Sequence, residues 1–147
     1  MTGANPIFYG MLLMSRAGTG KVLATMASAM NLNFTGYALG QADGSTNVVL
    51  VNKDATSAVS ASVNVGAPVA GASAIYLMGA SLTATTGVTL AGAGISAAGA
   101  WSPNPPYALP STGSVVSWPV DMIRFLSVHP RMRRGWNRWV SSVIREL

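Results

Sequence analysis

The chain has 147 residues, of which half are hydrophobic, 9% are charged and none is cysteine. This length is enough for one domain with its own core, and the lack of cysteine excludes disulfides and thiolate metal sites. The net charge of +5 arises entirely from residues 122–147, so we expect the body of the chain not to bind nucleic acid and only the basic end to contact anionic surfaces.

An apolar segment near the start predicts a helix from Pro6 to Leu23. Pro6 suits the first helical position, and Asn5 can cap the helix. The most apolar part, Ile7–Met14, lacks a basic flank and a small-residue cleavage site, so we predict no signal peptide. The absence of cysteine is compatible with a secreted bacterial protein, but it does not fix a location.

The segment Tyr37–Asp54, YALGQADGSTNVVLVNKD, predicts a β-hairpin. Asp43 and Gly44 supply the turn, because glycine accepts the positive φ that a tight reversal requires. Val48–Val51 contains no polar residue, whereas a strand exposed on one face would alternate. We therefore expect this strand to be covered on both faces.

Short segments with β-type patterns continue to residue 120. Ala55–Val65 alternates strictly, which predicts a strand with one buried and one wet face. The four prolines within Pro103–Pro110 predict a loop outside any sheet. Short strands separated by frequent turn signals favour an all-β fold, namely a β-sandwich of antiparallel strands. The further predicted strands are Ala74–Met78 and Val115–Val120, and the buried face of Ala55–Val65 comprises Val59, Ala61, Val63 and Val65.

The basic end of the chain, Met122–Leu147, has a different pattern. Apolar residues there recur at helical spacing opposite a polar face, which predicts a short basic amphipathic helix. Such a helix is either a solvated extension or a contact for phosphates or anionic lipid. We therefore divide the chain into residues 1–25, a β-sandwich at 26–121 and a basic tail at 122–147. The apolar positions of the tail are Trp136, Trp139, Val140, Val143, Ile144 and Leu147.

The sequence offers little material for catalysis or for a cofactor. Ala17–Lys21 has glycines beside a lysine, but it closes a predicted helix and lacks the spacing of a phosphate-binding loop. His129 is the only histidine, which argues against a catalytic triad or a two-histidine metal site. We predict no catalytic residue, no cofactor site and no metal site. The four carboxylates have no evident pair, and we interpret them as solvated residues in turns and at the ends of strands or of the chain: Asp43, Asp54, Asp121 and Glu146.

Aromatic side chains are the remaining candidates for a binding surface. Exposed rings form stacking platforms in carbohydrate-binding sandwiches, and the candidates here are Tyr76, Trp101, Tyr107 and Trp118, of which we select Trp101 and Tyr107 for sugar contact. In a chain this poor in aromatics, Trp101 and Trp118 are more often core residues, because large apolar side chains dominate burial.

Three segments in order resemble the C-terminal part of a glycoside hydrolase of family 79, the heparanase and β-glucuronidase group. They are Asn5–Leu23, similar to the last helix of the catalytic barrel, Phe34–Asp54, and Ala74–Pro103 with LMGASL, GVTLAG and then Trp101. The resemblance implies an accessory β-domain that packs beside a catalytic (β/α)8 barrel. It also implies that the two catalytic glutamates lie on that barrel, upstream of Met1, so no catalytic residue is carried over to this chain.

The basic tail departs from the family pattern, which closes with another apolar strand after the region of Val115–Val120. We therefore predict a change of reading frame near Asp121 or a foreign tail. The function expected from the resemblance is that of a non-catalytic accessory β-domain lacking its barrel, inactive by itself. Two alternatives stay open, a stand-alone carbohydrate-binding module and a basic-tail protein that binds membrane or nucleic acid.

Overall fold

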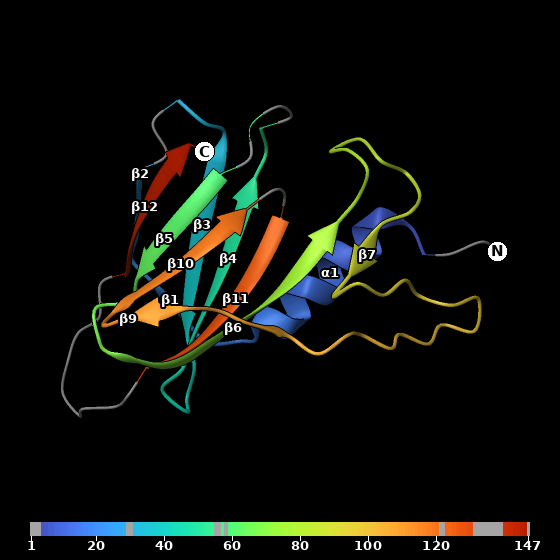
Figure 1. Ribbon diagram of the computed structural model, residues 1–147. Helices are drawn as coiled ribbons and strands as arrows, with labels where there is room; N and C mark the ends of the chain where they lie inside the picture. Colours follow the sequence, from blue (N-terminus) through green and yellow to red (C-terminus); the bar gives the residue numbers. More distant parts are fainter. Residues whose placement is uncertain are drawn as a thin grey trace.

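The computed structural model of the chain describes residues 4–28, 31–54, 57, 59–120, 123–130 and 140–146. Within these residues the fold is mostly β, with one helix, α1 (Pro6–Ala17), and strands in two sheets (Figure 1). In chain order the strands are β1 (Lys21–Leu23), β2 (Thr25–Ser28), β3 (Phe34–Gly40), β4 (Thr46–Asn52), β5 (Val59–Asn64), β6 (Val69–Met78), β7 (Thr89–Leu90), β8 (Tyr107–Ala108), β9 (Ser111–Thr112), β10 (Val115–Val120), β11 (Ile123–Pro130) and β12 (Val140–Glu146).

The larger sheet has seven strands in the order β1-β3-β4-β11-β6-β7, with β8 also paired to β6. All its pairings are antiparallel. β11 lies between β4 and β6, with Phe125 opposite Val49 on one side and Ile75 on the other. The two halves of this sheet are therefore joined through β11.

The smaller sheet has five strands in the order β2-β12-β5-β10-β9. Its described pairings are antiparallel except that between β12 and β2, which is parallel. The prediction of antiparallel strands thus holds for every described pairing but one.

The hairpin formed by β3 and β4 confirms the prediction for Tyr37–Asp54. Gly44 has a φ of 83°, and the Asp43 carboxylate accepts hydrogen bonds from both the backbone N–H and the hydroxyl of Ser45. Strand β4 is covered on both faces: Leu50 faces the cluster shared with the smaller sheet, and Val49 faces the cluster that includes α1. Val48–Val51 contains no polar residue because each face of β4 packs against apolar side chains.

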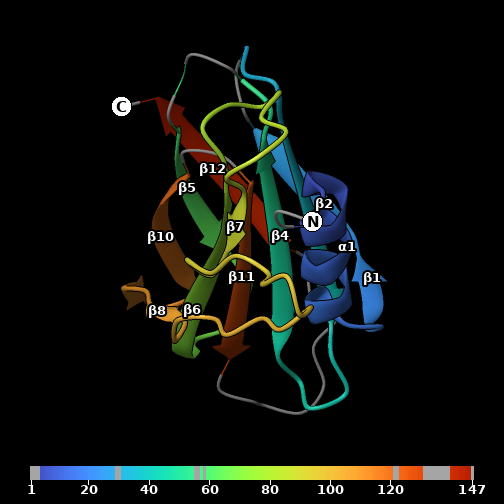
Figure 2. The same ribbon diagram turned by 90° about the vertical axis from the view of Figure 1, so that its right-hand side faces the viewer.

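Buried side chains of both sheets form one core cluster. Leu50 and Ala74 come from the larger sheet, and Val63 and Trp118 come from the smaller one. The strict alternation predicted for Ala55–Val65 is confirmed in β5, where every second residue is fully buried. Figure 2 shows β5 and β10 on the side of β4 and β11 opposite to α1.

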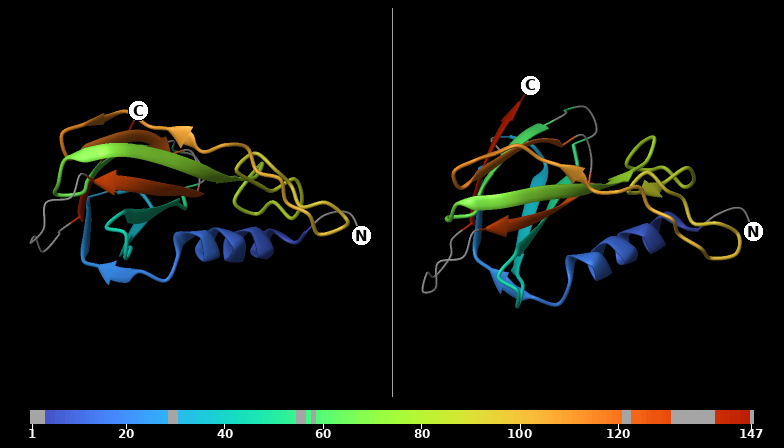
Figure 3. Two further views of the ribbon diagram at one scale, coloured as in Figure 1. Left: turned by 90° about the horizontal axis from the view of Figure 1, so that it is seen from below. Right: turned by 60° about the horizontal axis from the view of Figure 1, so that its bottom comes forward.

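Helix α1 packs on the other face of the larger sheet, where Figure 3 shows it running alongside the strands. Asn5 caps the helix by accepting a hydrogen bond from the Ile7 N–H at 3.2 Å, and Pro6 occupies the first turn. Tyr9, Leu13 and Ala17 recur at four-residue spacing, so they form one buried stripe along the helix. This stripe packs against Val49, Leu77 and Leu90.

Two predicted boundaries are wrong. The helix ends at Ala17 instead of Leu23, because Gly18 adopts a φ of 83° and residues 21–23 pair with β3. Pro103–Pro110 is not entirely a loop: β8 pairs with β6 through Ser73 and Ala74. Two residues between prolines can still donate and accept along a sheet edge, whereas a proline itself cannot donate.

The helix predicted for Met122–Leu147 is also wrong where the structure describes this segment. Residues 123–130 and 140–146 form β11 and β12. β11 fills the place between β4 and β6, and β12 pairs with β5 and β2, so backbone pairing outweighs the helical spacing of the side chains. Trp136 and Trp139 lie outside the described residues.

Candidate functional site

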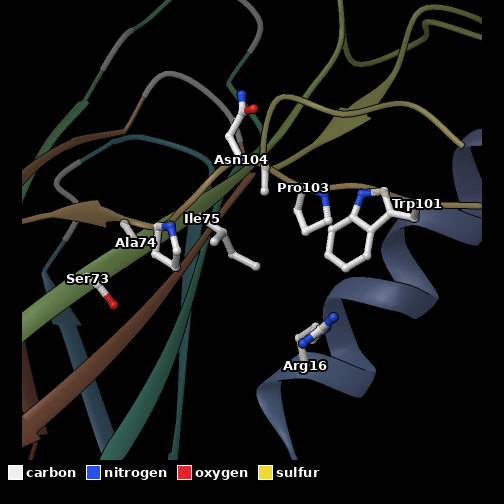
Figure 4. Close-up of a pocket in the computed structure, with 9 residues that line it drawn as sticks. Arg16, Ser73, Ala74, Ile75, Trp101, Pro103 and Asn104 are labelled. Carbon is white, nitrogen blue, oxygen red and sulfur yellow. The ribbon is translucent and has the colours of Figure 1, made fainter.

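A cavity of about 300 Å³ lies between the end of α1, strand β6 and the segment that follows β7 (Figure 4). Its walls are mostly apolar, with one guanidinium group at the edge. A preformed, largely apolar hollow with a few polar groups is the usual form of a small-molecule site. The lining residues are Arg16, Ser73, Ala74, Ile75, Ala91, Trp101, Pro103, Asn104 and Pro106.

The segment that forms one wall is fixed by backbone hydrogen bonds. The Ala91 N–H donates to the Tyr76 carbonyl at 2.8 Å, and the Asn104 N–H donates to the Ala91 carbonyl at 3.0 Å. Ala91 has a φ of 51°, a left-handed conformation that is uncommon for a residue with a side chain. The Tyr9 hydroxyl accepts from the Ile95 N–H at 2.9 Å, which ties the same segment to α1. The wall is therefore held from both the sheet and the helix.

Arg16 and Trp101 contact each other at the edge of the cavity. The Arg16 guanidinium carbon lies 4.9 Å from the ring centroid of Trp101, which is a cation–π geometry. The Trp101 indole N–H donates to the Leu90 carbonyl at 3.1 Å, so the orientation of the ring is set. Arg16 also lies in the last turn of α1, where a positive charge complements the helix dipole.

The two predicted sugar-contact residues do not share a site. Trp101 lines the cavity, whereas Tyr107 packs on Tyr76 with ring centroids 5.0 Å apart and is 55% exposed. Trp118 is fully buried in the core, as its core interpretation predicts, and the ring centroids of Tyr76 and Trp118 lie 6.4 Å apart in an edge-to-face arrangement. Sequence reasoning did not single out Arg16, Ile75 or Asn104, because their proximity arises only from the packing of α1 on the sheet.

The carboxylates with described side chains accept hydrogen bonds within local turns. Asp43 accepts from Ser45, and Asp54 accepts from the Ser57 N–H at 3.1 Å. Asp121, His129 and Glu146 have no described side chain, so their predicted roles lie outside the described residues. Among the side chains that the structure describes, no group of three or more potential metal ligands occurs.

The outer face of α1 is apolar and exposed. Ile7, Met11 and Met14 are 70%, 66% and 55% exposed, and Phe8 beside them is about half exposed. These four residues, which we call the outer stripe, lie on the surface of a helix whose opposite stripe is buried. An exposed apolar patch of this kind is typical of an interaction surface.

No model of a known protein family matches the chain, and no curated protein matches its sequence. Within the described part of the chain, α1 is too short to span a membrane and no other helix occurs.

Proposed function

We propose that the chain is a non-catalytic accessory β-domain, similar to that of family-79 glycoside hydrolases, which packs against a catalytic (β/α)8 barrel. The outer stripe of α1 carries this proposal. A surface helix normally presents one apolar stripe to its core and a polar face to water. α1 buries Tyr9, Leu13 and Ala17 on one side and exposes Ile7, Met11 and Met14 on another, so a second partner surface would cover it.

The arrangement of the sheets supports the same proposal. We propose that the two sheets form a β-sandwich, because one apolar cluster draws side chains from both. β11 follows Val115–Val120 at the point where the family pattern closes with a strand, although its sequence belongs to the basic tail that departs from that pattern. A frame change near Asp121 stays a prediction, which the parent DNA sequence tests.

A binding experiment tests the proposal. The chain is co-expressed with the isolated barrel of a family-79 β-glucuronidase, and complex formation is measured by co-purification and analytical centrifugation. We expect a one-to-one complex that Met11→Glu disrupts, because a carboxylate would be buried without a partner. Val22→Glu is the matched control, since Val22 is equally apolar and exposed but lies on β1. A folded chain that forms no complex, or a complex equally weakened by both variants, would contradict the proposal.

The chain alone should not hydrolyse β-glucuronides, because the proposal places the catalytic glutamates on the barrel. Turnover of an aryl β-glucuronide by the purified chain would show this assignment of activity to be wrong. An enzyme preparation carrying the barrel serves as the positive control.

A carbohydrate-binding role is a second proposal, favoured by the Tyr107 ring. This ring is exposed yet held against Tyr76, so little conformational entropy is lost when a flat ligand stacks on it. Glycan-array binding that Tyr107→Ala abolishes and that Tyr37→Ala leaves intact would support it. Tyr37 is a suitable control because its side chain is equally exposed on β3. An array without a Tyr107-dependent signal would refute it.

A further inference from the structure

The Arg16 guanidinium is a positive charge without a protein anion in the described part of the chain. Its described side-chain contact is the Trp101 ring, and no described carboxylate pairs with it. Asp43 and Asp54, the carboxylates with described side chains, bind Ser45 and Ser57 in their own turns. Because a guanidinium has five N–H donors in a fixed plane, those of Arg16 are available to a ligand.

The cavity beside Arg16 is mostly apolar. Ile75, Ala91 and Pro103 form much of the wall, and Figure 4 shows Ile75 and Pro103 beside the space that Arg16 and Trp101 border. The proline ring and the hydrogen bond from Trp101 to the Leu90 carbonyl limit how far this wall can move. A volume of about 300 Å³ is at the lower end for small-molecule sites, which suits a ligand about the size of one ring with a short substituent.

We propose that this cavity binds a small organic carboxylate with a flat apolar body. The carboxylate pairs with the Arg16 guanidinium through two parallel N–H···O hydrogen bonds, the geometry that this fork favours. The apolar body lies against Ile75 and Pro103. Arg16 is the only cation of the lining, and Ser73 and Asn104 are its other polar side chains without an aromatic ring, so the cavity suits one negative charge better than the two charges of a phosphate. The proposal goes beyond the accessory-domain function and does not depend on it.

Ligand titration of the full chain by ¹H–¹⁵N NMR tests the proposal, with phenylacetate as the probe and phenylacetamide as its neutral analogue. The indole N–H signal of Trp101, assigned with Trp101→Phe, reports on the cavity. We expect saturable shifts of this signal with phenylacetate, and at least tenfold weaker binding of phenylacetamide. Equal binding of the two probes, or no shift of the Trp101 signal with phenylacetate up to 50 mM, overturns the proposal.

Substitution of the cation provides the second arm. Arg16→Gln should weaken phenylacetate binding about tenfold or more, because it removes the charge-assisted pair. Arg16→Lys should retain part of the affinity, since it keeps the charge but loses the fork. Lys53→Gln, which removes the same charge from an exposed site after β4, should leave the affinity unchanged. Unchanged affinity in Arg16→Gln, with a dispersed spectrum confirming the fold, overturns the proposal.

Discussion

The carbonyl oxygen of Ala17 ends α1 and is bound by two side-chain amides. Asn47 Nδ2 donates to it at 2.9 Å and Gln41 Nε2 at 3.2 Å, so the β3–β4 hairpin holds the end of the helix. Ala17 is 0% exposed, and water therefore does not replace these donors easily. The last carbonyls of a helix have no N–H partner within the helix, so the two hydrogen bonds to the Ala17 carbonyl contribute to the stability of the helix end.

The effect of removing both amides should exceed the sum of the single changes. In Asn47→Ala or Gln41→Ala one donor remains, so we expect each to lower the free energy of unfolding by about 0.5–1.5 kcal/mol. In the double variant the buried carbonyl has no donor, and an unsatisfied buried acceptor costs about 1–3 kcal/mol. The coupling between the two positions should therefore be about 1 kcal/mol or more.

Urea denaturation of the four proteins in this cycle measures the coupling, with the unfolding slope checked for constancy. Asn47→Ala combined with Ser62→Ala provides a control cycle, because Ser62 lies on β5 in the smaller sheet. The control pair should be additive within about 0.5 kcal/mol. Additivity within the same limit for the Asn47–Gln41 pair would refute the shared-acceptor account.

Three further predictions concern the sheets. Leu50→Ala should lower the free energy of unfolding by about 2–5 kcal/mol, whereas Val22→Ala at an exposed site should change it by less than about 0.5 kcal/mol, both measured by urea denaturation; equal effects would contradict the core assignment. Deletion of residues 123–147 should abolish cooperative thermal unfolding, because β11 joins β4 to β6. A peptide of residues 123–130 should partly restore it, whereas cooperative unfolding of the truncated chain alone would show that β11 is dispensable. Position 124 is paired in register with Leu50, whose side chain is fully buried. Arg124→Leu should therefore raise the thermal midpoint, by about 2–4 °C for each kcal/mol gained in the free energy of unfolding. A lower midpoint would contradict this register.

The local turns and alternating strands could be predicted because their signals lie within a few residues. The β3–β4 hairpin depends on the positive φ of Gly44 and on the hydrogen bonds that Ser45 donates to the Asp43 carboxylate, all within one turn. In β5 the alternation itself encodes one buried face. The apolar segment Val48–Val51 in β4 predicted that both faces of the strand are covered, but it did not predict that α1 covers one of them.

The features that sequence reasoning missed depend on partners far along the chain. Residues 140–146 have helical spacing of apolar side chains, yet they pair with β5 and β2. The short strand β8 forms because β6 offers it an edge. The candidate site depends on the contact between Arg16 and Trp101. In the sequence alone, a basic residue at the end of an apolar helix predicts only a favourable interaction with the helix dipole.

We propose that the outer stripe of α1 is the surface that meets a catalytic barrel. Because the chain has no cysteine, a single cysteine introduced by Met11→Cys reports directly on this surface, and Val22→Cys serves as the control. The rate of maleimide labelling is measured with and without a saturating family-79 barrel. We expect at least tenfold slower labelling at position 11 and no change at position 22. Unchanged labelling at position 11 in a complex that has formed would contradict it.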